Sequence, residues 1–448
     1  PTIVANVSEC IKCQRDLVPM RLLYPAVETE DMIVKWCDRA TDKSTEKSRA
    51  LERQVYALRT AVREANLPYL ELPVETSADE AIDAFIKMNT TLVRLSAFDI
   101  VVAQMEAATG KSLHKLEKLL RSAVPAAEKY VDVPKLVLRV AALREDRSPT
   151  EASFMRLDMR RLADDWVPIV EGVRGATSFL AEERILDRDR LPTVAIVPVL
   201  ASIWSQMPQT LDKHGEGRTL LRQYLWRSFF TDRYERAANT AALQDHRGMK
   251  ARLVDGDTEA PIPVFDEAMF PIAEVGKLKR APWPKLRNTL SRGILAVSLR
   301  GGGSDFADGT PATWESMSKR EYHHLFPASL LKNEGYLEDS EVNLALNCAL
   351  VTWNTNRNIS AKEPVAYLRE RVERAHLGED QIRHRLSSHV IPFEKLNVGG
   401  YSNIDAEEER SAKIRSDFEC FVHSRAEAIH GVVRKLCNGE EWSRWEGN

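Results

Sequence analysis

EYHHLFP, at residues 321–327, places two adjacent histidines just before an apolar pair and a proline. Proline has no backbone hydrogen to donate to a neighbouring strand, so we expect a strand that ends in a loop at Pro327. Turn-forming and charged residues follow at 332–341, and residues 344–351 form an apolar run typical of a second strand. Residues 354–360 then lead into a helical pattern. The predicted order is strand, loop, strand, helix.

These three pieces, in this order, resemble the centre of an HNH nuclease. Such a centre hydrolyses a phosphodiester with a general base, a divalent cation and a third group that fixes the ring of the base. Two adjacent histidines can divide the first two tasks where a strand ends in a loop. The same residues leave open an alternative, which is a structural histidine pair with an asparagine capping the helix.

The resemblance extends to the GmrSD-like, modification-dependent (type IV) restriction endonucleases. Residues 277–437 are similar to the C-terminal HNH domain of that family, through HHLFP at 323–327, NL at 343–344, TNRNI at 355–359 and PVAYL at 364–368. Residues 85–90 and 95–99 are similar to part of its N-terminal ParB-like domain, and residues 227–234 to the helical segment between the two. The resemblance therefore spans nearly the whole chain.

Matching the HNH pattern position by position implies a role for each polar residue. His324 corresponds to the general base, and His323 and Asn356 correspond to the metal ligands. Asn343 corresponds to the central asparagine that orients the loop carrying His324. Asn354 and Asn358 lie close enough in sequence to exchange roles with Asn356.

The expected metal is Mg²⁺, because a site with few protein ligands, several waters and a substrate phosphate is how Mg²⁺ usually binds. The histidine ligand would also admit Mn²⁺, Ni²⁺ or Zn²⁺. Arg357 and Lys362 are predicted to reach the scissile phosphate or a neighbouring one, since both are cations beside the matched helix.

One motif of the family is missing. Its N-terminal domain normally carries the sequence DGQQR, which is linked to nucleotide hydrolysis, and this sequence occurs nowhere in the chain. The chain also begins at Pro1 without an obvious first strand. We therefore expect either a divergent member or the downstream part of a longer or split protein, and the resemblance does not extend to nucleotide-dependent regulation.

Length and composition set further bounds. With 448 residues, 44% of them hydrophobic, the chain should hold two or three domains. Its longest apolar run, residues 191–204, contains two prolines and is shorter than the ~20 residues that span a bilayer. No signal segment begins the chain, so we expect a cytoplasmic protein without a membrane partner. Six scattered cysteines predict reduced thiols, and Cys10 and Cys13 lack the second cysteine pair that a structural zinc site needs.

The net charge of −3 is not typical of a nucleic-acid-binding protein, but the charge is unevenly distributed. Residues 277–300 include seven basic side chains and no acidic one. Among them, Lys279, Arg280, Lys285 and Arg287 are predicted to contact the phosphates of DNA, which would give salt-sensitive affinity independent of sequence. An ordinary solvated helix face is the alternative.

The expected fold class is α+β and predominantly helical, with a C-terminal ββα-metal HNH nuclease embedded in helices. Residues 1–130 are predicted to be the remainder of the ParB-like domain, residues 131–260 a helical connecting region, and residues 261–448 the nuclease domain with a C-terminal helix. Residues 255–266, rich in proline and acidic side chains, are the best linker candidate. Two helices are predicted from their periodicity, one over 44–66 with Leu51, Val55, Leu58 and Val62 on one face, and one after Asp405 with Ile414, Phe418, Val422, Ile429, Val433 and Leu436.

The function that these observations favour is that of a metal-dependent HNH DNA endonuclease in antiphage restriction of modified DNA. The expected partners are DNA, modified or from phage, and either a partner chain for the N-terminal part or a second copy of the chain. Two alternatives stay open, a catalytically inactive DNA-binding or regulatory subunit and an RNA-directed nuclease, because such a centre acts on the phosphate and bases are recognised elsewhere.

Overall fold

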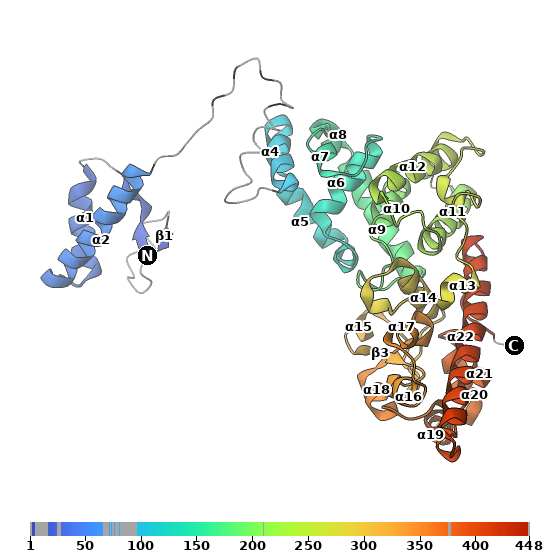
Figure 1. Cartoon of the computed structure of the whole chain (residues 1–448). Coiled ribbons are helices and arrows are strands. Elements are labelled where there is room, and N and C mark those ends of the chain that lie inside the picture. Colours follow the sequence, from blue (N-terminus) through green and yellow to red (C-terminus); the bar gives the residue numbers. More distant parts are fainter. Residues whose placement is uncertain are drawn as a thin grey trace. The chain divides into compact units, whose positions relative to one another are not determined.

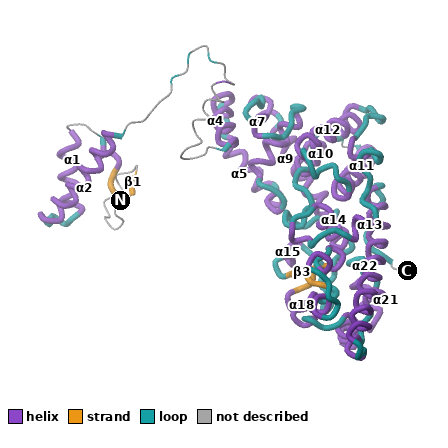
Figure 2. Tube along the Cα trace, viewed as in Figure 1, coloured by secondary structure: helices purple, strands orange, loops and turns teal. Residues whose placement is uncertain are grey.

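The computed structural model describes residues 2–4, 17–24, 28–65, 71, 73, 76, 80, 96–208, 210–374 and 378–446. The chain divides into two compact units, Pro1–Ala81 and Ile82–Asn448. Helices predominate in the described chain, as predicted, and strands form two two-stranded sheets (Figures 1 and 2). Cys10, Cys13 and residues 85–95, which carry part of the ParB-like resemblance, lie outside the described residues.

The first unit combines a short parallel strand pair with two helices. Its elements are β1 (Thr2–Val4), β2 (Leu17–Pro19), the 3₁₀ helix η1 (Met20–Leu23), α1 (Glu28–Ala40) and α2 (Thr45–Glu64). Val55 of α2 is fully buried against Ile33 and Cys37 of α1. The predicted helix over 44–66 is confirmed by α2, but Val62 is 48% exposed and does not belong to the apolar cluster that includes Val55 and Leu58.

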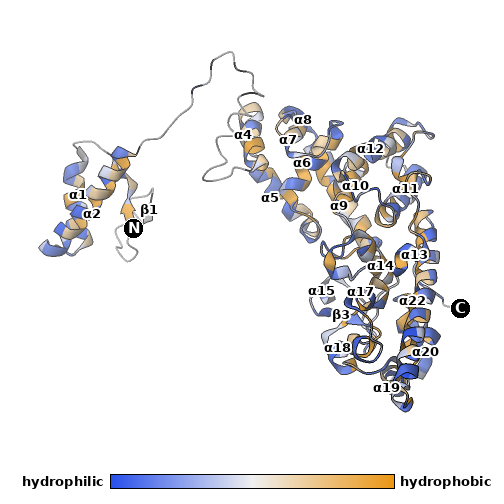
Figure 3. Ribbon diagram, viewed as in Figure 1, coloured by the Kyte–Doolittle hydropathy of each residue, from blue (hydrophilic) through white to orange (hydrophobic). Residues whose placement is uncertain are grey.

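The second unit begins with helices that pack on one another. They are α4 (Ala97–Thr109), α5 (Leu113–Ala123), α6 (Val133–Arg144), α7 (Glu151–Phe154), α8 (Met159–Asp164), α9 (Trp166–Glu182), α10 (Ile196–Trp204), α11 (Leu211–Phe230) and α12 (Ala238–Lys250). The central one is α10, whose sequence is almost entirely apolar and is coloured accordingly in Figure 3. It is buried along nearly its whole length and packs against α6, α9 and α12.

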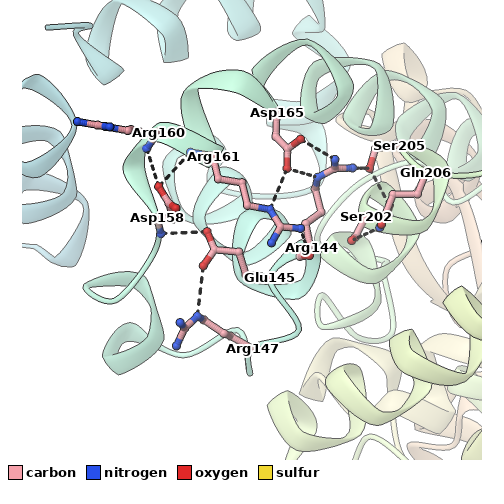
Figure 4. A network of polar contacts seen from close by, with 10 residues as sticks. All are labelled: Arg144, Glu145, Arg147, Asp158, Arg160, Arg161, Asp165, Ser202, Ser205 and Gln206. Carbon is pink, nitrogen blue, oxygen red and sulfur yellow. Dashed lines mark hydrogen bonds and ion pairs between the residues drawn. The ribbon is translucent and has the colours of Figure 1, made fainter. Parts of the chain in front are cut away.

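A polar network holds several of these helices together at one edge of the core (Figure 4). Arg144, at the end of α6, pairs with Asp165 at 2.9 Å and donates a hydrogen bond to Ser205 Oγ at 2.5 Å. Asp158 caps α8, because its Oδ1 accepts from the backbone N–H groups of Arg160 and Arg161 at 2.9 and 3.1 Å. The network thus fixes the ends of α6, α8 and α10 relative to one another.

The rest of the second unit surrounds a small antiparallel sheet. Its elements are α13 (Val275–Lys279), α14 (Thr289–Arg300), α15 (Trp314–Met317), β3 (Arg320–His324), α16 (Ala328–Asn333), α17 (Asp339–Val342), the 3₁₀ helix η6 (Ala345–Asn347), β4 (Cys348–Thr352), α18 (Trp353–Ile359), α19 (Pro364–Arg374), α20 (Gly378–Ser387), α21 (Phe393–Leu396) and α22 (Glu407–Cys437). Strands β3 and β4 pair in the register His323↔Ala349 and Arg320↔Thr352, and α18 follows β4 at once.

The second strand begins later than predicted. The apolar run 344–351 was expected to be extended throughout, whereas residues 345–347 form η6 and β4 begins at Cys348. The cause is Asn347, whose side chain accepts from the Phe326 N–H at 2.8 Å and donates to the carbonyls of Phe326 and Val342 at 3.1 and 3.2 Å. These three bonds hold the backbone in a turn that an apolar pattern does not indicate.

One hydrophobic cluster runs through the second unit, from Phe98 of α4 to Trp442. It includes Ile262 and Val264, so the second half of the predicted linker 255–266 packs into the core, whereas residues 255–259 are exposed. The predicted domain boundaries after residues 130 and 260 both fall within this unit and stay predictions. None of the described helices has both the length and the apolar character needed to cross a bilayer.

The long helix α22 packs against α11, α13 and α14 in the second unit. All six apolar positions predicted for it are buried, which confirms both the helix and its packing face. Arg425 in its middle is fully buried and has no carboxylate partner among the described residues. Its guanidinium donates instead to the carbonyls of Leu346 at 2.6 Å and Cys348 at 3.0 Å, and to those of His389 and Val390. This side chain ties α22 to the start of β4.

Candidate functional site

The two histidines of β3 contact two different asparagines. His323 Nδ1 lies 2.7 Å from Asn356 Oδ1, on α18, and His324 Nε2 lies 3.0 Å from Asn343 Oδ1, which follows α17. Because an amide oxygen only accepts hydrogen bonds, each contact places the ring proton on the nitrogen that faces it. The predicted residues His323, His324, Asn343 and Asn356 therefore come together as two hydrogen-bonded pairs at one end of the small sheet.

His324 is held on one face by an aromatic ring. Trp283 stacks on its imidazole, with the ring centroids 4.1 Å apart and the planes 15° from parallel. Trp283 is brought there by its neighbours, because Pro282 forms a β-bridge with Leu344 and the Ala345 N–H donates to the Ala281 carbonyl at 2.9 Å. Sequence analysis missed Trp283. The available signal was an aromatic residue inside the basic segment, residues 277–300.

His323 is the more deeply buried histidine, at 4% exposure. Burial lowers its pKa to about 4, against the raising effect of the bond with Asn356, so the ring is neutral at pH 7. Its Nε2 is buried without a hydrogen-bond partner among the described residues. Burial also lowers the pKa of His324, although its hydrogen bond with Asn343 partly offsets this effect. Both rings are thus available as neutral bases or ligands.

Two further side chains position the site, and sequence analysis missed both. Asn347 holds the backbone of Phe326, two residues after His324, so the loop is fixed by Asn347 and the His324 ring by Asn343. Asp305 accepts from the Thr352 N–H and from Thr355 Oγ1, both at 2.6 Å, at the start of α18. Burial raises the pKa of Asp305, but hydrogen bonds from Thr355, Thr352 and nearby amides outweigh burial and leave the pKa below its usual value.

Asn356 is distinguished from its neighbours by geometry. Asn354 and Asn358 are exposed, whereas Asn356 is half-buried and is the asparagine of α18 that contacts His323. Its amide nitrogen also donates to Glu321 Oε2 at 2.7 Å. The nearest atoms of the two predicted metal ligands, His323 Nδ1 and Asn356 Oδ1, therefore lie side by side.

The spacing of these two atoms, which share a hydrogen bond in the structure, is compatible with a small, hard cation. Neighbouring ligands of an octahedral Mg²⁺ shell, with bonds of about 2.1 Å, are separated by roughly 3.0 Å, close to the 2.7 Å between His323 Nδ1 and Asn356 Oδ1. For binding through Nδ1, the ring proton must move to Nε2. No cluster of three or more His, Cys, Asp or Glu side chains able to hold a metal occurs among the residues that the structure covers.

The basic side chains of residues 277–300 differ in whether they pair with a carboxylate. Arg280, Lys285 and Arg287 are exposed and Lys279 is half-buried, and none of the four forms an ion pair with a described residue. By contrast, Lys277 pairs with Asp232, and Arg300 pairs with Glu183. In the sequence, the four cations lie on both sides of Trp283, which stacks on His324.

The other two predicted phosphate contacts lie on the helix side. Arg357 is exposed on α18, with its guanidinium 4.7 Å from the ring centroid of Trp353. Lys362 is already engaged, because its amine donates to both carboxylate oxygens of Glu370, at 2.7 and 2.8 Å. Arg357 is therefore the better placed of the two for a phosphate.

Comparison with known proteins gives a distant relative. No family model matches the chain. The chain is similar to uncharacterized protein MJ0686 of Methanocaldococcus jannaschii, at 22% identity over 396 residues that cover 82% of this chain and 63% of the relative. The chain thus spans less than two thirds of that protein's length, and the name of the relative states no activity.

Proposed function

We propose that this chain is a metal-dependent endonuclease of the HNH type that hydrolyses phosphodiester bonds in DNA. The observation that carries the proposal is the pairing of His323 with Asn356 and of His324 with Asn343, on a strand, strand, helix framework. A purely structural histidine pair would need no stacked Trp283, no half-exposed His324 and no exposed cations in the segment that carries Trp283. Together these features favour chemistry over packing.

In the proposed mechanism, His324 is the general base. The Asn343 contact keeps the proton on Nε2 and leaves the lone pair of Nδ1 to take a proton from water. The water oxygen then bonds to phosphorus, and the bond from phosphorus to the leaving oxygen breaks. A divalent cation held by His323 and Asn356 would neutralise the charge that develops on the phosphate and the leaving oxygen. Trp283 and Asn343 hold the His324 ring in place, so the base is already oriented when the water attacks.

DNA is the substrate that the surroundings favour. Lys279, Arg280, Lys285 and Arg287 can neutralise backbone phosphates on the Trp283 side, and Arg357 can do so on the α18 side. A role in antiphage restriction of modified DNA rests on the family resemblance and belongs to the same proposal. An RNA substrate and an inactive binding subunit are the alternatives that an assay must separate.

The test is a plasmid-nicking assay with Mg²⁺ or Mn²⁺, on modified and unmodified DNA and on an RNA of similar length. We expect wild-type cleavage of DNA and a loss of roughly 10²–10⁴-fold in His324→Ala, because the base acts only when water attacks. His423→Ala, which removes an exposed histidine on α22, is the matched control and should cut normally. Wild-type cleavage without any divalent cation, or a fully active His324→Ala, would refute the proposal.

A further inference from the structure

Glu321 lies on the same side of β3 as His323. Side chains two residues apart on a strand share one face, and α18 lies against this strand. Glu321 is exposed while His323 is buried, so the carboxylate of Glu321 lies nearer the surface than the imidazole of His323. The two side chains are linked through one group, the amide of Asn356.

The Asn356 amide is oriented by its two partners. Its nitrogen donates to Glu321 Oε2 at 2.7 Å, and its oxygen faces His323 Nδ1 at 2.7 Å. A carboxylate only accepts hydrogen bonds, so the NH₂ group must face Glu321 and the oxygen must face His323. Glu321 Oε1 accepts no hydrogen bond from a described residue, and Glu321 forms no ion pair with one. One oxygen of the Glu321 carboxylate is therefore left open, on the side chain that holds the Asn356 amide.

Glu321 differs from Asp305, the other carboxylate near the site, because one of its oxygens is open. His323 and Asn356 are both neutral ligands, whereas a hard divalent cation binds best where at least one anionic oxygen contributes. Asp305 also contacts α18, but its oxygens are used by the Thr352 N–H, by Thr355 Oγ1 and by the amides that follow it. Glu321 is the carboxylate that is hydrogen-bonded to the His323–Asn356 pair and still has an open oxygen.

We propose that Glu321 is a third protein ligand of the divalent cation, binding through Oε1 while Oε2 keeps the Asn356 amide in place. The inference rests on the proposed function, since it concerns the same metal site. It changes the donor set from two neutral atoms to one carboxylate oxygen, one amide oxygen and one imidazole nitrogen. Three positions of an octahedral shell then remain for water and phosphate.

The experiment measures Mn²⁺ binding to the full chain by calorimetry, without DNA. Glu321→Gln keeps the size of the side chain and removes its charge, and it should weaken Mn²⁺ binding by at least about 10-fold. Glu321→Asp keeps the charge on a shorter stem and should bind Mn²⁺ more tightly than Glu321→Gln. Glu409→Gln, on an exposed turn of α22, is the matched control and should bind as wild type does. Circular dichroism melting checks that each variant is folded.

Two different failures can be told apart. If Glu321→Gln binds Mn²⁺ as tightly as wild type while His323→Ala does not, Glu321 is not a ligand and the metal site itself stands. If the wild-type chain binds no Mn²⁺ at all, both the inference and the metal-dependent function are wrong.

Discussion

Asn343 and Asn356 contact different histidines, so their replacement should change different kinetic quantities. Asn356→Ala removes a proposed ligand and should raise the Mn²⁺ concentration needed for half-maximal cleavage. Asn343→Ala leaves that ligand in place but frees the His324 ring, so the cleavage rate at saturating Mn²⁺ should fall. Cleavage rates measured across a Mn²⁺ titration separate the two. Asn358→Ala, exposed on the same helix as Asn356, is the control, and identical curves for Asn343→Ala and Asn356→Ala would count against the division of roles.

At the scale of single residues, the sequence predicted the site residues that lie within the matched motifs. It missed those that reach the site from other parts of the chain. The HHLFP, NL and TNRNI pieces predicted His323, His324, Asn343 and Asn356 through their resemblance to the HNH pattern. Trp283, Asn347 and Asp305 make contacts that depend on how distant backbone segments approach each other. Their residue types are common at structural positions, so spacing alone gives no signal for them.

The basic segment that contains Trp283 is the element on which DNA affinity should depend. Replacing Lys279, Arg280, Lys285 and Arg287 by glutamine should weaken binding to any DNA sequence and flatten its salt dependence. Each lost phosphate contact lowers the slope of log K against log[salt] by about 0.9. The measurement is fluorescence anisotropy with labelled duplex DNA over a range of NaCl concentrations.

The control for this variant removes the same amount of charge elsewhere in the second unit, at the exposed residues Lys111, Lys115, Lys118 and Lys135. It should leave the slope nearly unchanged. If the two quadruple variants have the same slope as wild type, the basic segment is an ordinary solvated surface.

Among the elements, α22 and β4 show where periodicity succeeds and where it fails. Each of the six apolar positions predicted for α22 is buried, because a long helix against one core repeats the same contact each turn. Other buried positions of this helix, such as Phe421 and Arg425, were not predicted. The start of β4 was misplaced, since the hydrogen bonds of Asn347 turn a segment whose apolar pattern is equally compatible with a strand. A side chain that bonds the backbone overrides the pattern locally.

For the whole second unit, buried neutral histidines predict that stability falls with acid. Burial lowers the pKa of His246 to about 4 and that of His389 to about 3, whereas an unfolded histidine titrates near 6.5. Below pH 6.5 the unfolded chain binds protons that the folded chain does not, so the stability present above 6.5 is lost as pH falls toward 4. His323, whose pKa burial also lowers to about 4, is a third such group, and three groups give a slope of about 4 kcal/mol per pH unit in the free energy of unfolding. Urea unfolding at pH 7.5, 6 and 5 measures this slope.

His423→Ala should not alter that dependence, because His423 is exposed on α22. His389→Gln should reduce the slope, provided that the variant keeps the wild-type circular dichroism spectrum. A free energy of unfolding that stays constant between pH 6.5 and 5 would show that these histidines are not held neutral by the fold. The large hydrophobic cluster that runs from Phe98 to Trp442 explains why composition alone could not place domain boundaries in the second unit.

Arg425 has a consequence for the order in which the protein is made. Strand β4 leaves the ribosome well before Arg425 is synthesised, and until then the carbonyls of Leu346 and Cys348 lack the donor that they have in the folded chain. Chains tend to fold unit by unit as they emerge. An unfinished copy would carry both histidines without the framework that sets their positions, so nascent chains should be inert and activity should arise only once synthesis has passed most of α22.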